Sequence, residues 1–199
     1  FQLLCTMMDE STPHKKRIAA LTKEHIAVVP YDPAWPQRFL ELEGRLKKLL
    51  PKNLVQRIAH IGSTAVPGLS AKPIIDVQVE VNDLQEVRDR VVPMMEEEGY
   101  EFIWRPSIGE NAPFYAWFIK RNEKGERTEH VHIVAPDHVS AERIMFRDIL
   151  RRHPEEATAY EELKSTLAKK YAKDRVAYTQ GKSEFIQAIL RKGRDGKLK

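Results

Sequence analysis

Apolar and polar positions alternate along several short stretches of the chain and follow helical spacing along longer ones. Alternation of β-branched and polar residues predicts strands at residues 55–61, 73–81, 100–104, 114–120 and 129–135. Apolar positions three and four residues apart, with start and stop signals, predict helices at residues 33–50, 83–96, 140–153, 154–171 and 183–192. We therefore expect an α/β (α+β) fold, in which flanking helices cover a mixed β-sheet and a helical carboxyl-terminal part follows.

The same pattern divides the chain into regions. Residues 1–24 lack a period and are expected to form a flexible arm. Residues 25–192 are expected to form one domain, with its sheet part ending near residue 136 and its helical part covering 140–192. Residues 193–199 have the composition of a solvated tail.

Composition and charge narrow the classes of function. No apolar run approaches the roughly 20 residues that a membrane span needs, so we expect no membrane segment. The net charge of +4 suits an anionic ligand and is too small to favour nucleic acid. Cys5 is the single cysteine, which excludes an internal disulfide and favours a reducing, cytoplasmic setting.

One segment carries most of the candidate chemistry. The turn Gly62-Ser63-Thr64 follows one expected strand, and Asp76 lies on the next. Backbone N–H groups in such a turn can bind anionic oxygens, while a carboxylate on the adjacent strand holds a divalent cation. An ordinary turn between paired strands accounts for the same residues equally well.

The sequence from His60 to Glu80, HIGSTAVPGLSAKPIIDVQVE, resembles the GrpB family and, through it, the nucleotidyltransferase superfamily. The resemblance covers roughly residues 26–190. It extends to the segments VPYDPAW at 29–35, HVH at 130–132, FRDILR at 146–151 and YEELK at 160–164, and to Tyr178 and Lys182.

The resemblance implies a nucleotidyltransferase-like fold and a reaction between a nucleoside triphosphate and a small acceptor. It assigns phosphate binding to Gly62 and Ser63, and the binding of a divalent metal, magnesium or manganese with zinc as an alternative, to Asp76. The superfamily carries a second acid where this chain has Gln78, which supplies no charge. Glu80 shares that face but lies about 13 Å along the strand from Asp76, too far to replace the second acid.

The superfamily's third acid belongs to a neighbouring strand, at the segment that contains His130 and His132. These histidines alternate onto one face, and Asp76 with both of them would make a three-ligand metal site. In the alternative interpretation one histidine is packed in the core and the other contacts a phosphate or a carboxylate.

Several further residues are candidates for catalysis or phosphate binding. His60 is expected to share the face of Gly62, where it orients Asp76 or carries a proton; a histidine packed against the backbone is the alternative. Thr64 belongs to the phosphate-binding turn. Lys72, at the entrance to the second strand, either reaches a phosphate or remains in solvent.

The carboxyl-terminal helices add charged and aromatic pairs one turn apart. If their faces converge over the sheet, they form a cationic wall for a triphosphate; solvated helix faces are the alternative. The residues assigned to this wall are Arg147, Arg151, Lys164, Tyr178 and Lys182.

Two functions follow from these patterns. The first is a metal-dependent nucleotidyltransferase with Asp76 in the metal site and His60 as a second catalytic residue. The second is a non-catalytic module that binds a nucleotide or another anionic metabolite, which the neutral Gln78 favours.

Overall fold

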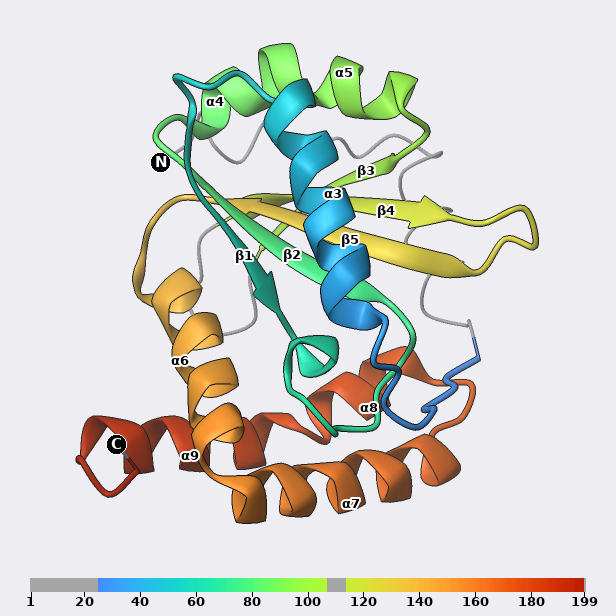
Figure 1. Cartoon of the computed structure of the whole chain (residues 1–199), viewed down its shortest axis with the longest axis vertical. Coiled ribbons are helices and arrows are strands. Elements are labelled where there is room, and N and C mark those ends of the chain that lie inside the picture. The colour runs from blue at the N-terminus through green and yellow to red at the C-terminus, as the bar shows by residue number, and fades with distance from the viewer. Residues whose placement is uncertain (1–24, 107–113, 199) are drawn as a thin grey trace.

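The computed structural model describes residues 25–106 and 114–198, and its centre is a five-stranded sheet in the order β1-β2-β5-β4-β3 (Figure 1). β2 and β5 are parallel, and the other neighbouring strands are antiparallel. This mixed sheet confirms the expected fold class. The strands are β1 (Val55–Ile61), β2 (Ile75–Val81), β3 (Glu101–Pro106), β4 (Phe114–Arg121) and β5 (Arg127–Val134).

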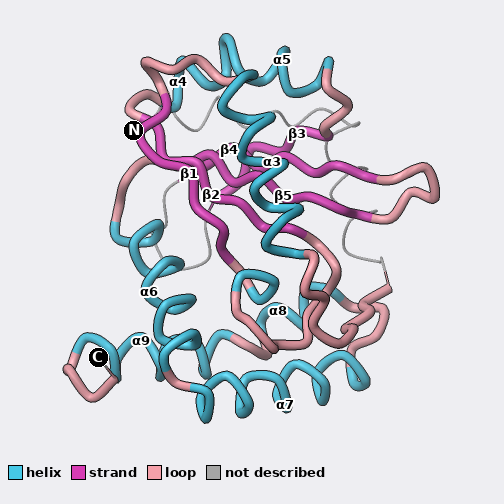
Figure 2. The backbone as a smooth tube through the Cα atoms, in the orientation of Figure 1, coloured by secondary structure: helices cyan, strands magenta, loops and turns pink. Residues whose placement is uncertain are grey.

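Helices pack on the sheet and below its strand ends (Figure 2). The described helices before β5 are α3 (Trp35–Leu49), the short η1 (Ser63–Ala65), α4 (Leu84–Glu86), η2 (Val87–Val91) and α5 (Val92–Glu97). The helices after β5 are α6 (His138–Arg152), α7 (Pro154–Lys170), α8 (Arg175–Gln180) and α9 (Ser183–Arg194). α3 and the segment from α4 to α5 cover one face of the sheet, η1 lies at the end of β1, and the second group forms the helical carboxyl-terminal part.

The main core lies between α3 and one face of β2. Val77 and Val79 of β2 are completely buried, and they belong to the same cluster as Leu42 and Leu46, which are spaced by one helical turn on α3. Full burial of each such side chain contributes about 1.5–3 kcal/mol. Because side chains alternate along a strand, the opposite face of β2 presents Asp76 and its polar neighbours.

Two expected helices differ in detail from the structure. The first begins at Trp35 rather than residue 33, and the Asp32 carboxylate accepts a hydrogen bond from the Ala34 N–H just before it. The second is not uniform, because the π-helical turn η2 precedes Pro93. Proline has no N–H to donate, so the wider turn accommodates it where a regular helix would lose a bond.

The sequence pattern missed one helix. α8 lies in the stretch that separates the last two expected helices, and the Asp174 side chain caps it by accepting from the Val176 and Ala177 N–H groups. Asp174 is a residue type that favours the start of a helix, so the sequence did contain a signal for α8.

The expectation of a flexible arm at residues 1–24 lies outside the described residues. Among the described helices, none is long and apolar enough to cross a bilayer.

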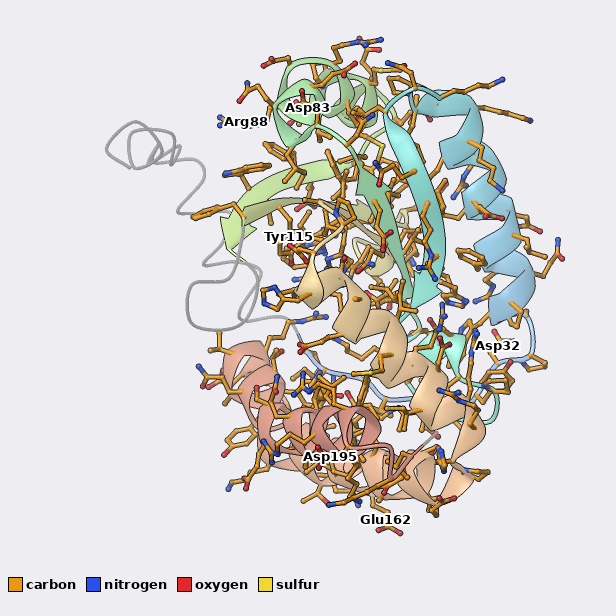
Figure 3. The ribbon with its side chains drawn as sticks, turned by 90° about the vertical axis from the view of Figure 1, so that its left-hand side faces the viewer. Asp32, Asp83, Arg88, Tyr115, Glu162 and Asp195 are labelled. Carbon is orange, nitrogen blue, oxygen red and sulfur yellow. The ribbon has the colours of Figure 1, made fainter. Side chains whose placement is uncertain are left out.

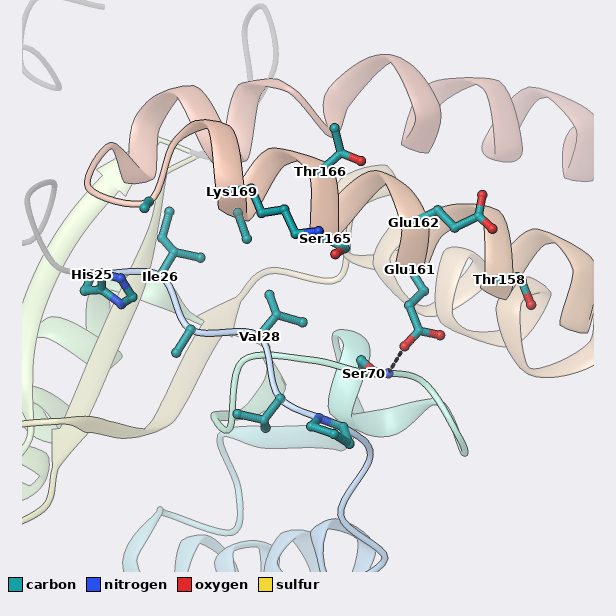
Figure 4. A pocket seen from close by; sticks show the side chains of 15 residues that line it. His25, Ile26, Val28, Ser70, Thr158, Glu161, Glu162, Ser165, Thr166 and Lys169 are labelled. Carbon is teal, nitrogen blue, oxygen red and sulfur yellow. Dashed lines mark hydrogen bonds between the residues drawn. The ribbon is translucent and has the colours of Figure 1, made fainter.

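α7 holds the loop that leads into β2. Glu161 accepts a hydrogen bond from the Ser70 N–H at 3.2 Å, and the Lys164 ammonium donates to the Ser70 carbonyl. Figure 4 shows the first of these bonds at the border of a cavity of about 960 Å³ between α7 and residues 25–30. One helix therefore fixes both backbone groups of a single loop residue.

We predict that Lys164→Met lowers the free energy of unfolding by about 1–2 kcal/mol, because the Ser70 carbonyl loses its donor while the volume of the side chain is kept. Lys169→Met, an exposed change on the same helix, should stay within about 0.5 kcal/mol of the parent. Urea denaturation measures both. Equal stability of the two variants would contradict a holding role for Lys164.

Candidate metal and anion site

The parallel pairing of β2 and β5 brings one carboxylate and two imidazoles together. In the register, Asp76 lies beside His130 and Gln78 beside His132, on one face of the sheet. His130 Nδ1 is 2.9 Å from Asp76 Oδ1, and His132 Nε2 is 3.7 Å from the same oxygen. One ligand atom from each residue lies within 4.8 Å of the others. The expected convergence of these three residues is therefore confirmed.

This donor set can hold a metal ion. One carboxylate oxygen and two imidazole nitrogens suit manganese, iron or zinc, whereas magnesium prefers oxygen ligands alone. His130 is 6% exposed, and its Nε2 atom has no hydrogen-bond partner among the described residues. The side chain of Asp76 remains 26% exposed, so a ligand can reach it.

The charge of Asp76 is stabilised by its neighbours. Burial alone would raise the pKa of this carboxyl, but the hydrogen bond from His130 and the nearby His132 imidazole together outweigh burial and place the pKa below its usual range. Burial also lowers the pKa of His130 to about 4. At neutral pH Asp76 is therefore an anion next to a neutral His130, which is the protonation state that metal ligation requires.

The Gly62 turn lies directly against Asp76. Gly62 has φ of 72°, and a β-carbon built on it would lie 2.7 Å from Asp76 Oδ2. Both the backbone conformation and this close approach require glycine. The expected proximity of turn and carboxylate is therefore correct. The next residue, Ser63, has its side chain hydrogen-bonded to Tyr160 of α7.

Thr64 and His60 do not take their expected places. His60 pairs with Val77 across the antiparallel ladder, and it therefore shares the core face rather than the face of Asp76. Its ring stacks on Phe39 at 4.6 Å, and its Nε2 atom is 3.1 Å from the Thr64 hydroxyl. That hydroxyl donates to the Ile74 carbonyl and is buried. The expectation that His60 orients Asp76 is wrong, because the strand register turns its side chain to the other face.

Two of the predicted cations lie near Asp76. The ammonium groups of Lys72 and Lys182 are 5.6 and 4.6 Å from the centre of the buried Tyr178 ring. Burial, with Lys182 and Arg175 nearby, lowers the pKa of Lys72 to about 7; burial likewise lowers the pKa of Lys182 to about 8, and Asp76 opposes both shifts. The convergence of Lys72, Tyr178 and Lys182 is as expected.

The sequence pattern missed two arginines of this cluster. Arg175 and Arg127 both contribute to the electrostatic environment of Lys72. Arg175 belongs to the unexpected helix α8, and Arg127 lies at the start of β5, 6% exposed, with its guanidinium 5.6 Å from the Trp117 ring. Neither belongs to a recognisable motif, so only the fold could identify them.

The other predicted cations bind backbone instead. Arg147 donates to the His60 carbonyl at 2.8 Å, Arg151 to the Ala65 carbonyl at 2.8 Å, and Lys164 to the Ser70 carbonyl. Arg147 also pairs with Asp148 at 2.7 Å. The expected cationic wall is therefore split: these three side chains fix residues 60–70, and the phosphate contacts predicted for them are not supported.

Gln78 has a structural reason to be an amide. Its Nε2 donates to Glu80 Oε1 at 3.0 Å and to the Ser140 carbonyl at 3.1 Å, and Gln78 is 1% exposed. A carboxylate here would face two acceptors without a proton to share. The remaining Oε1 atom is buried without a partner among the described residues.

Tyr115 and Arg143 mark the border of this face at the start of α6. The Arg143 guanidinium lies 5.0 Å from the centre of the Tyr115 ring, and Figure 3 shows Tyr115 between the sheet and the beginning of that helix. The Tyr115 ring is 5.5 Å from that of His132. An aromatic side chain of β4 therefore lies beside His132 of β5.

Comparison with known proteins identifies the family. The profile of the GrpB protein family matches residues 25–192. The chain belongs to the GrpB family. A UPF0157 protein of Pseudomonas aeruginosa is 42% identical over 168 residues, which cover 84% of this chain and 67% of the relative. A UPF0157 protein of Bacillus subtilis is 36% identical over 167 residues, which cover 83% of this chain and 46% of that relative, so the chain spans about half its length.

A solved structure supports the GrpB fold. The crystal structure of the conserved protein GrpB from Enterococcus faecalis is 34% identical and superposes with a TM-score of 0.73, covering 87% of this chain and all of that one (100%). The likeness confirms the fold that the sequence indicates. Membership in the GrpB family does not by itself name a reaction.

We predict that Gly62→Ala lowers the free energy of unfolding by about 1–3 kcal/mol and weakens the binding of Mn²⁺, because the new methyl group displaces the Asp76 carboxylate. Gly44→Ala, in α3 with open space around the new carbon, should stabilise the protein by about 0.5–1 kcal/mol. Thermal unfolding without Mn²⁺ measures the stability of both variants, and the added stability with Mn²⁺ measures the affinity of Gly62→Ala for the metal. An unchanged metal affinity in Gly62→Ala would contradict the conclusion that a side chain at position 62 displaces the Asp76 carboxylate.

Proposed function

We propose that this GrpB protein is a metal-dependent nucleotidyltransferase, which transfers a nucleotidyl group from a nucleoside triphosphate to a small hydroxyl or amine acceptor. The observation that carries the proposal is the group Asp76, His130 and His132 beside the Gly62 turn, with excess positive charge around it. A metal site next to cationic side chains suits a substrate with several phosphate oxygens.

The side chains would divide the work. A bound divalent ion would neutralise phosphate charge and polarise the reacting phosphorus centre. Asp76, His130 and His132 would hold that ion, and manganese fits them better than magnesium. Lys72 and Lys182 would bind the phosphate oxygens remote from the ion, with the Gly62–Ser63 backbone as an additional donor. The buried Tyr178 ring keeps the two ammonium groups in place.

A second candidate is a binding module without catalysis. The observation that favours it is Gln78, which supplies no second carboxylate and is held by Glu80 and Ser140. Such a module would capture a nucleotide or another anionic metabolite at the same cations. Its binding would not require a metal and would release no pyrophosphate.

We predict that the parent protein binds ATP in the presence of Mn²⁺ and releases pyrophosphate when a suitable acceptor is supplied, and that Asp76→Asn abolishes the release while the fold is kept. Calorimetric titration with and without Mn²⁺, combined with a pyrophosphate assay, tests this. Asp195→Asn, on the far carboxyl-terminal tail, is the matched control. Metal-independent ATP binding without pyrophosphate would support the module, and the absence of ATP binding under every condition would refute both functions.

We predict that the affinity for inorganic triphosphate in the absence of metal falls as the pH rises from 6 to 9. The pKa values of Lys72 and Lys182 are lowered to about 7 and 8, so both ammonium groups lose their protons within this range. Calorimetry of the parent and of Lys182→Met measures the slope, which should be shallower in the variant. A pH-independent affinity would contradict the role of these lysines.

A further inference from the structure

A second cavity lies on the outer side of β1, away from Asp76. Its volume is about 530 Å³, which is in the range of small-molecule sites. It is bounded by α3, by the edge of β1, by the segment after η1 and by α6. Its lining includes Phe39, Leu40, Arg57, His60 and Arg151. We call this cavity the outer-strand pocket.

The walls of the outer-strand pocket are mostly apolar. Phe39 and His60 contribute a parallel ring pair with an interplanar angle of 6°. Leu40 is 54% exposed, more than any other large hydrophobic side chain among the described residues. Burial lowers the pKa of His60 to about 4, and the ring is neutral at physiological pH. A ligand with an apolar body would therefore bury carbon surface here.

The charge of the outer-strand pocket is positive. Glu43, its one lining carboxylate, pairs with Lys47 at 3.0 Å, and Arg147 is neutralised by Asp148. Arg151 is 3.9 Å from the same Asp148 oxygen and 39% exposed. The Arg57 side chain is exposed and makes no hydrogen bond or ion pair within residues 25–106 and 114–198. The Arg57 guanidinium is thus available at the rim, and Arg151, whose Nε donates to the Ala65 carbonyl, adds the outer edge of a second guanidinium group.

We propose that the outer-strand pocket binds a small organic anion, namely a carboxylate or phosphomonoester group attached to an apolar body. The apolar body packs against Phe39 and Leu40, and Arg57 and Arg151 bind the anionic group. Guanidinium groups bind both kinds of anion in bidentate geometry, which makes them suitable for this role. The excess of positive over negative charge excludes a cationic ligand.

This site is separate from the metal and anion site. In the antiparallel register of β1 with β2, His60 lies on the α3 face and Asp76 on the opposite face, and Arg57 pairs with Glu80, four residues along β2 from Asp76. Neither Asp76 nor Lys182 lines the outer-strand pocket. Substitutions can therefore remove one site without affecting the other, and the proposal stands independently of nucleotidyl transfer.

The test is a calorimetric titration of the full chain in the presence of a chelator, with benzoate, phenyl phosphate and inorganic phosphate as probes. We expect benzoate or phenyl phosphate to bind, and inorganic phosphate to bind at least about tenfold more weakly, because it lacks the apolar body. Arg57→Gln and Leu40→Glu should each weaken the organic probe by about tenfold or more. Both positions are exposed, so the fold should tolerate the changes.

Control variants assign the binding to one site. Lys48→Gln removes an exposed charge from α3 outside the pocket and should leave the affinity unchanged. Asp76→Asn and Lys182→Met should also leave it unchanged. The proposal is overturned if neither organic probe binds, if inorganic phosphate binds equally well, or if the affinity depends on Lys182 rather than on Arg57 and Leu40.

Discussion

The parallel contact between β2 and β5 is the constraint on which the site depends. It joins two segments that are 54 residues apart, and its register sets Asp76 directly beside His130. A shift of one residue would turn both histidines into the core and remove two of the three ligand atoms. Val131 and Ile133 of β5 oppose such a shift, since they would then leave the core that they form with β2 and α3.

The β2–β5 pairing also sets the protonation states of the side chains that it brings together. Asp76 is held ionised by its histidine neighbours, while burial favours the neutral forms of His130, Lys72 and Lys182. Buried lysines whose proton affinity is reduced gain most from a ligand that restores the charge balance. A polyanion does so, and a divalent ion at Asp76 would strengthen the same attraction.

The carboxyl-terminal helices mostly position the loop rather than bind a ligand. Side chains from α6 and α7 hold the carbonyl groups of His60, Ala65 and Ser70, so the turn around Gly62 is fixed from two sides. Among the predicted members of the cationic wall, Lys182 lies near Asp76, with the Tyr178 ring of α8 against its ammonium group. The positive surface left over from this division lies at the outer-strand pocket, where Arg151 and the unpaired Arg57 meet apolar walls.

The local pattern of the sequence determined the strands, most of the helices and the face of β2 that carries Asp76, because these depend on spacing and on which residues avoid water. The GrpB-like motif also indicated the Gly62 turn and the two histidines. Tertiary structure alone decided the rest. The antiparallel register turned His60 away from Asp76. The side chains of Arg147, Arg151 and Lys164 donate hydrogen bonds to backbone carbonyl groups instead of facing the site. The missed helix α8 brought Arg175 to Lys72. Which long side chain reaches which partner depends on distances between elements far apart in the chain, and helical or strand periodicity carries no information about those distances.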